Sequence, residues 1–84
     1  MSTPFEQAAE RASNPPVELT NEQRLRFYGL FKQATKGDVT TDRPGMFSPT
    51  DRAKWDAYKE CEGMDKEAAE QAYIAFTEEC FDGK

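Results

Sequence analysis

Four segments of this chain open on residues that typically cap helices, and no segment shows the alternating pattern of a strand. Thr3 precedes a proline and has Glu6 three residues later, while Thr20 has Gln23 at the same spacing. In this arrangement the cap and the later side chain each bond a free backbone amide at the start of the helix. The sequence therefore predicts an all-α protein, with helices following the caps Thr3, Thr20, Ser48 and Asp65.

Apolar side chains recur at helical spacing after each cap, so the helices should share one core. In the second helix the stripe includes Phe27, Leu30 and Ala34, and Gly37 is expected to end the helix. Gly29 lies inside this helix, where glycine costs about 1 kcal/mol relative to alanine, which suggests that a neighbour packs closely there. From the other helices we expect core residues that include Phe5, Ala8, Trp55, Tyr58, Cys61, Ala69, Tyr73, Phe76 and Cys80.

The connection from Gly37 to Phe47 is long for a helical bundle and has no apolar periodicity. Its eleven or so residues can extend to roughly 36 Å, whereas the second helix is only about 24 Å long. The loop can therefore run back along the second helix, so that the third helix starts beside its beginning and lies parallel to it. The links at 14–19 and 62–64 are short and favour antiparallel neighbours, so the sequence predicts a four-helix up-down-down-up bundle.

Length and composition narrow the class of protein. A chain of 84 residues is expected to form a single domain spanning 1–84. Two cysteines cannot provide the disulfide framework of a small secreted protein, so we expect Cys61 and Cys80 to be free and partly buried. The N-terminal residues lack the pattern of a signal peptide, and no apolar run is long enough to cross a membrane. These features predict a soluble, cytoplasmic protein.

Charge is distributed unevenly along the chain. Residues 24–59 carry eight basic and four acidic side chains, a net charge of +4, although the whole chain has a net charge of −5. The remaining residues carry three basic and twelve acidic side chains, a net charge of −9. A locally basic centre on an acidic protein indicates an anionic ligand more directly than the total charge does.

One stripe of the second helix changes from apolar to aromatic to cationic. Leu25, Tyr28 and Lys32 lie at positions i, i+3 and i+7 and therefore share a face. Near the start of the third helix, Arg52 and Lys54 add positive charge where free backbone amides already favour anions. This pattern suits an amphiphile with a phosphate group. Lysines and tyrosines also commonly cover apolar surface with their polar ends in water, and periodicity alone favours that structural role.

Two other features have ordinary structural explanations. Trp55 is expected in the core rather than against a ligand. Arg43-Pro44-Gly45 has the composition of a simple turn.

The order of the residues is more specific than any single feature. The chain contains FEQAA at 5–9, YGLFKQATKGD at 28–38, TDRPGMFSPTDRAKWDAY at 41–58 and KEAAEQAYI at 66–74. This combination closely resembles the acyl-CoA-binding protein family. The resemblance covers nearly the whole chain. It implies an up-down-down-up bundle that binds medium- and long-chain acyl-CoA esters noncovalently, as an intracellular pool former and carrier.

The resemblance also implies the residues of the binding site. By position, Tyr28, Lys32 and Lys54 would hold the phosphorylated ribose end of coenzyme A, and Tyr73 would help to close the adenine site. The further candidates are Gly29, Leu30 and Phe31, followed by Ser13, Leu25, Thr50 and Arg52.

Three positions depart from the family pattern. Phe31 stands where the family usually has tyrosine, so the aromatic face is kept and a hydroxyl hydrogen bond is lost. Ser13 stands where relatives often carry a basic residue, and Thr50 where some carry lysine. The basic side chains of relatives at these two positions imply contacts with phosphate. This chain lacks those basic side chains.

Competing classes of protein lack essential residues. The chain has no histidine, no nucleophile beside a plausible base and no cluster of metal ligands, so we expect neither catalysis nor a bound cofactor or metal. An acyl carrier protein needs a serine for phosphopantetheine attachment, but Ser48 lies between Phe47 and Pro49 rather than in an Asp-Ser-Leu setting.

A helical protein-interaction module remains the alternative, in which the candidate residues would share no small-molecule ligand. With acyl-CoA as the partner, we expect a monomer with no nucleic acid ligand and no stable membrane insertion.

Overall fold

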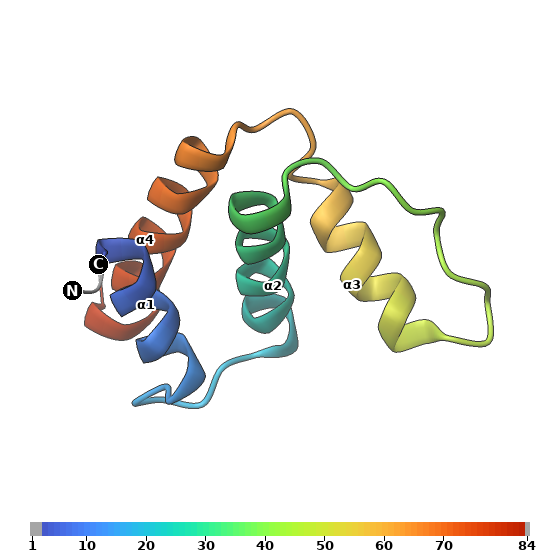
Figure 1. Ribbon diagram of the computed structural model, residues 1–84. Helices are drawn as coiled ribbons and strands as arrows, with labels where there is room; N and C mark the ends of the chain where they lie inside the picture. Colours follow the sequence, from blue (N-terminus) through green and yellow to red (C-terminus); the bar gives the residue numbers. More distant parts are fainter. Residues whose placement is uncertain (1–2, 84) are drawn as a thin grey trace.

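The computed structural model describes residues 3–83, which form four α-helices and no strand. The helices are α1 (Pro4–Ser13), α2 (Asn21–Lys36), α3 (Pro49–Lys59) and α4 (Lys66–Asp82). In Figure 1, α1 and α4 run in one direction, while α2 and α3 run side by side in the other. The long loop after α2 passes back along α3 to reach its start. The predicted all-α fold and up-down-down-up topology are confirmed.

Local capping accounts for three of the four helix starts. In α1, the Glu6 amide donates to Thr3 Oγ1 at 3.1 Å, and the Thr3 amide donates to Glu6 Oε1 at 2.9 Å. Thr20 and Gln23 make the same pair of bonds at the start of α2, and Asp65 caps α4 by accepting from the Ala68 amide at 2.7 Å. The capping predictions for these helices are confirmed.

Ser48 precedes α3 but does not cap it with its side chain. Its ψ angle is 66°, whereas Thr3 and Thr20 have the extended values of 162° and 164° that aim a cap side chain at the first turn. Instead, the Ser48 amide donates to the Gly45 carbonyl at 3.1 Å, closing a turn before the helix. Here the loop geometry overrides the local preference of serine for the cap position.

The core lies mainly among α1, α2 and α4. The second helix packs against both α3 and α4, and α1 packs against α4. At the centre, Tyr73 meets Phe5 and Phe27 edge-on, with ring centroids 5.2 Å apart in each pair. Such edge-to-face contacts add to the stabilisation from apolar burial. The other core residues are Ala8, Leu19, Leu30, Ala34, Cys61 and Ala69.

The two cysteines are free thiols, as expected, with Cys61 buried and Cys80 half-buried. Burial raises the pKa of both thiols, which disfavours the reactive thiolate near neutral pH. No helix in residues 3–83 is long and apolar enough to cross a bilayer.

Gly29 is the point of closest approach between α2 and α3. A Cβ atom at this position would lie 2.4 Å from the Ala57 carbonyl oxygen and 2.8 Å from its carbonyl carbon. Both are backbone atoms, so they can move only if the helix moves. The suggestion of close packing at Gly29 is confirmed, and the partner is the backbone of α3.

The loop between α2 and α3 is anchored at its start. Asp38 Oδ1 accepts from Gln33 Nε2 at 2.8 Å and from the Gly63 amide at 2.9 Å. The hydroxyl of Tyr58 donates to the Gly37 carbonyl at 2.7 Å. These bonds join the end of α2 to α3 and to the α3–α4 connection.

Two further contacts anchor the middle of the loop to α3. Trp55 Nε1 donates to the Thr41 carbonyl at 3.0 Å, and Arg43 forms a two-point ion pair with Asp56 at 2.9 and 2.8 Å. Trp55 is only half-buried and lies outside the main core, so the expectation of a core tryptophan is wrong. The indole needs a hydrogen-bond partner, and the passing loop provides one. Arg43, expected in a simple turn, is an anchor for the loop.

Asp38→Asn is expected to lower the free energy of unfolding near pH 7 and to have a smaller effect in acid. Hydrogen bonds from the Gly63 amide and the Gln33 side chain lower the pKa of Asp38. Because the folded-state pKa lies below the ordinary value of about 3.9, the stabilisation is present above about pH 4 and is lost as pH falls through the folded-state pKa. Urea unfolding of both proteins across this range measures the effect.

Asp42→Asn is the matched control, because Asp42 lies in the same loop and makes no hydrogen bond or ion pair within residues 3–83. The difference in the free energy of unfolding between Asp42→Asn and the unmodified protein should change little with pH. A difference for Asp38→Asn that stays constant from neutral to acidic pH would contradict the proposed role of the charge.

Candidate ligand-binding site

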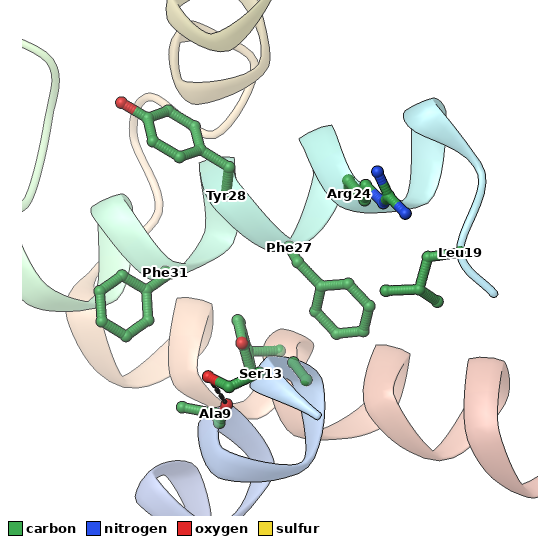
Figure 2. Close-up of a pocket in the computed structure, with 9 residues that line it drawn as sticks. Ala9, Ser13, Leu19, Arg24, Phe27, Tyr28 and Phe31 are labelled. Atoms are coloured by element: carbon green, nitrogen blue, oxygen red, sulfur yellow. Dashed lines mark hydrogen bonds between the residues drawn. The ribbon is translucent and has the colours of Figure 1, made fainter. Parts of the chain in front are cut away.

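Three of the cavities that border α2 form the candidate site, and Tyr28 lines two of these three. The first, which we call the aromatic cavity, has a volume of about 350 Å³ and lies between α1, α2 and α4. In Figure 2, Phe27 and Phe31 point from α2 toward this side, whereas Tyr28 points away from them. The lining residues are Ala9, Ala12, Ser13, Leu19, Arg24, Phe27, Tyr28, Phe31 and Tyr73.

The aromatic cavity offers flat faces and few charges. Phe31 is 40% exposed and stacks on Phe5, with ring centroids 5.8 Å apart. Tyr73 lies 6.2 Å from Phe31 between ring centroids and is almost fully buried. Burial raises the pKa of Tyr73, so its hydroxyl stays protonated and can donate. Ser13 already donates its hydroxyl to the Ala9 carbonyl at 3.0 Å (Figure 2).

The second cavity, which we call the basic cavity, has a volume of about 480 Å³ between α2, the long loop and α3. Three lysines and two aspartates line it, together with Tyr28, Trp55 and Tyr58. The ammonium of Lys54 lies 5.7 Å from the centre of the Tyr28 ring, and that of Lys32 lies 6.0 Å from the Tyr58 ring. The charged residues are Lys32, Lys36, Lys54, Asp38 and Asp51.

Lys32 and Lys54 are available for an anion. Within residues 3–83, neither forms an ion pair or a hydrogen bond to a carboxylate, whereas Asp38 is held by Gln33 and Gly63. Two lysines on neighbouring helices, each resting on an aromatic ring, converge on one hollow. Mobile ammonium groups in this arrangement suit a phosphate.

Tyr58 supports the basic cavity without competing for an anion. Burial, with smaller contributions from Tyr28 and Asp38, raises the pKa of its hydroxyl. The hydroxyl therefore remains neutral and donates to the Gly37 carbonyl.

The third cavity, which we call the α2–α3 cleft, has a volume of about 480 Å³ at the start of these two helices. It shares Lys54 with the basic cavity and Arg24 with the aromatic cavity. Most of its lining surface is apolar, although Asn21 and Thr50 line it together with these two cations. Such a surface suits a hydrocarbon chain attached to an anionic head. The lining residues are Asn21, Arg24, Leu25, Pro49, Thr50, Ala53 and Lys54.

The structure groups most, but not all, of the site residues expected from the sequence. Leu30 has no exposed surface, and Gly29 is covered by α3, so neither lines a cavity. Arg52 is half-buried and lines none of the three cavities, and its Nε has no hydrogen-bond partner within residues 3–83. Successive residues on a helix are rotated by about 100°, so a continuous run such as 28–32 cannot face one ligand. The residues that do line cavities are Ser13, Leu25, Tyr28, Phe31, Lys32, Thr50, Lys54 and Tyr73.

Arg24 lines the candidate site, and sequence reasoning missed it. It lines both the aromatic cavity and the α2–α3 cleft. The spacing contained a signal, because Arg24, Tyr28 and Lys32 recur every four residues and therefore share one face of α2.

Known proteins are similar to this chain in both sequence and fold. The model of the Acyl CoA binding protein family matches residues 2–77. The Acyl-CoA-binding domain-containing protein 1 of Oryza sativa subsp. japonica is 57% identical over 70 residues, which cover 83% of this chain and 77% of that protein. The Acyl-CoA-binding protein of Ricinus communis is 56% identical over 70 residues, covering 83% of this chain and 78% of that protein.

The structural comparison agrees. The crystal structure of Oryza sativa Acyl-CoA-Binding Protein 2 has a TM-score of 0.90 and 48% sequence identity, and the match covers 95% of this chain and 89% of that one. The match in fold therefore extends over nearly the whole bundle. The chain belongs to the acyl-CoA-binding protein family, as its motifs implied.

Proposed function

We propose that this protein binds medium- and long-chain acyl-CoA esters noncovalently and carries them as an intracellular pool. The observation that carries the proposal is the placement of Lys32 and Lys54. Both lack an ion-pair partner within residues 3–83, and Lys54 also borders the largely apolar α2–α3 cleft. An anionic head and a hydrocarbon tail could therefore be held on adjacent parts of one surface.

Each part of the ligand has a chemically suitable partner. Lys32 and Lys54 supply charge for the phosphates of coenzyme A, and Tyr28 between them can donate a hydrogen bond. The rings of Phe31 and Tyr73 in the aromatic cavity offer faces for the adenine. Because Phe31 has no hydroxyl, its contribution is limited to stacking.

The acyl chain is assigned to the α2–α3 cleft, where Leu25, Pro49 and Ala53 form apolar surface. Burying a methylene contributes about 0.8 kcal/mol, so each methylene held in the cleft should strengthen binding about fourfold. The cleft would favour long chains over short ones, while the lysines would favour the CoA ester over the free fatty acid.

We propose a monomeric, cytoplasmic carrier that forms one domain over 1–84, performs no catalysis and binds no nucleic acid. The family match and the absence of a membrane-spanning helix in residues 3–83 are compatible with this assignment.

Isothermal titration with palmitoyl-CoA below its micelle concentration tests the proposal. We expect saturable one-to-one binding that is much tighter than the binding of either free coenzyme A or palmitate, because only the ester occupies the basic cavity and the cleft together. No saturable binding by a folded sample would overturn the proposal and favour a protein-interaction module.

A further inference from the structure

Among the described residues, each pair of the three cavities shares one lining side chain. Tyr28 lines both the aromatic cavity and the basic cavity, and Lys54 lines both the basic cavity and the α2–α3 cleft. The side chain shared by the aromatic cavity and the cleft is Arg24. The function proposed above uses Tyr28 and Lys54 but gives no role to Arg24.

No contact within the fold explains the position of Arg24. Its side chain is exposed and forms no ion pair or hydrogen bond within residues 3–83. In Figure 2 no dashed line joins it to another lining residue. Arg24 is also the fourth residue of α2, where a positive charge opposes the helix dipole. The helix therefore does not require this arginine, and its guanidinium is available for an anion.

Arg24 supplies the charge of the aromatic cavity. Among the described residues that line this cavity, it alone is charged. Ser13, which lines the same cavity, already donates its hydroxyl to the Ala9 carbonyl. An anionic group at the edge of the aromatic cavity would therefore meet the guanidinium, which can bind phosphate oxygens at two points.

Arg24 and Lys32 are suited to two different anionic groups. They lie eight residues apart on α2, which corresponds to about 12 Å along the helix axis. Side chains on a helix lean toward its N-terminus, so both point the same way rather than toward each other. The Lys32 ammonium lies over the Tyr58 ring in the basic cavity, which Arg24 does not line. One phosphate is therefore unsuited to bind both cations.

The covalent order of an acyl-CoA ester indicates which group would reach Arg24. Adenine and ribose are followed by a diphosphate, the neutral pantetheine arm and the acyl chain, and a further phosphate branches from the ribose. In the proposed site the adenine occupies the aromatic cavity and the acyl chain occupies the cleft. The direct path between them crosses the border where Arg24 lies. The first anionic group on that path is the diphosphate.

We propose that Arg24 binds the diphosphate of the acyl-CoA ester, separately from the ribose phosphate bound by Lys32 and Lys54. This assignment rests on the proposed function and deepens it. The protein would recognise two anionic groups of the ligand with different side chains. An ester that lacks the ribose phosphate would therefore still depend on Arg24.

Isothermal titration with two esters tests the assignment. One ligand is palmitoyl-CoA, and the other is the palmitoyl ester of dephospho-coenzyme A, which lacks the ribose phosphate but keeps the diphosphate. Arg24→Met should weaken binding of both esters about tenfold, because it removes the guanidinium and keeps an unbranched apolar side chain. Lys54→Ala should weaken binding of palmitoyl-CoA but affect the dephospho ester much less, because the phosphate assigned to Lys54 is absent.

Arg26→Met is the matched control. Arg26 is also an exposed arginine of α2, but it lies two residues from Arg24 and therefore points about 200° away. It lines none of the three cavities. The substitution removes the same charge from the same helix, so its affinity for both esters should change little.

Two further measurements separate an ionic contact from other roles of Arg24. Added salt should reduce the difference in affinity between Arg24→Met and the unmodified protein, because salt screens the attraction between the guanidinium and the diphosphate. The thermal unfolding midpoint of ligand-free Arg24→Met should not fall, since the side chain makes no ion pair or hydrogen bond within residues 3–83.

Several results would overturn the assignment while leaving the proposed function in place. These are equal affinity of Arg24→Met and the unmodified protein for palmitoyl-CoA, a loss that disappears with the dephospho ester, and an equal loss in Arg26→Met. A loss that does not depend on salt, or a lower unfolding midpoint of Arg24→Met, would also overturn it. Failure of the folded, unmodified protein to bind either ester would instead overturn the proposed function, and the assignment with it.

Discussion

Gly29→Ala is expected to lower the free energy of unfolding by about 2–3 kcal/mol, although alanine normally stabilises a helix interior by about 1 kcal/mol relative to glycine. The new methyl group would lie 2.4 Å from the Ala57 carbonyl oxygen, which is far inside van der Waals contact. Because that oxygen belongs to the backbone, α2 and α3 must separate to admit the methyl group. Urea unfolding followed by circular dichroism measures the change.

The same substitution should also weaken ligand binding, because the proposed site needs Lys32 on α2 and Lys54 on α3 to reach the phosphates of the same ligand. Gly45→Ala is the matched control: a Cβ at Gly45 meets nothing within 4 Å. Its free energy of unfolding should change by less than about 1 kcal/mol. Equal stability of Gly29→Ala and the unmodified protein would show that the two helices are not held at this contact.

Lys54→Ala and Lys32→Ala are each expected to weaken palmitoyl-CoA binding roughly 10- to 100-fold, the range associated with loss of one hydrogen bond to a charged group. Each removes an ammonium group that has no ion-pair partner within residues 3–83. The loss of affinity should be greatest at low salt, because added salt screens the attraction between the lysine and the phosphate in the unmodified protein. Isothermal titration at two salt concentrations measures both effects.

Lys66→Ala provides the comparison for charge alone, because Lys66 lies at the start of α4 and lines none of the three cavities. It removes the same charge and should change affinity only slightly. The unfolding midpoint of Lys54→Ala should stay near that of the unmodified protein, because the side chain is exposed. If Lys66→Ala weakens binding as much as Lys54→Ala, the net charge of the protein, rather than a phosphate contact, determines affinity.

Most of the fold could be predicted from the sequence because its signals are local. The bonds of Thr3 with Glu6 and of Thr20 with Gln23 join residues three apart and lie within the first turn of each helix. The length of the loop limited the ways in which α2 and α3 could be connected. Ser48 shows where this reasoning fails, because the turn closed by Gly45 sets its ψ angle and the side chain makes no capping bond.

The candidate site was only partly predictable. The side chains of Tyr28, Lys32 and Lys54 line the basic cavity together, as the stripe and the family resemblance indicated. Leu30 shares the same stretch of chain but faces the core, and Arg24, one turn before Tyr28, borders two cavities.

The sequence by itself determined where the helices begin, how long their connections are and which charged and aromatic side chains are available. Only the tertiary structure decided that Gly29 meets Ala57 and that Lys54 rests over Tyr28. Capping bonds and loop lengths depend on residues close together in the chain. Contacts between α2 and α3 instead depend on the separation and rotation of two helices, which the packing of the whole bundle sets.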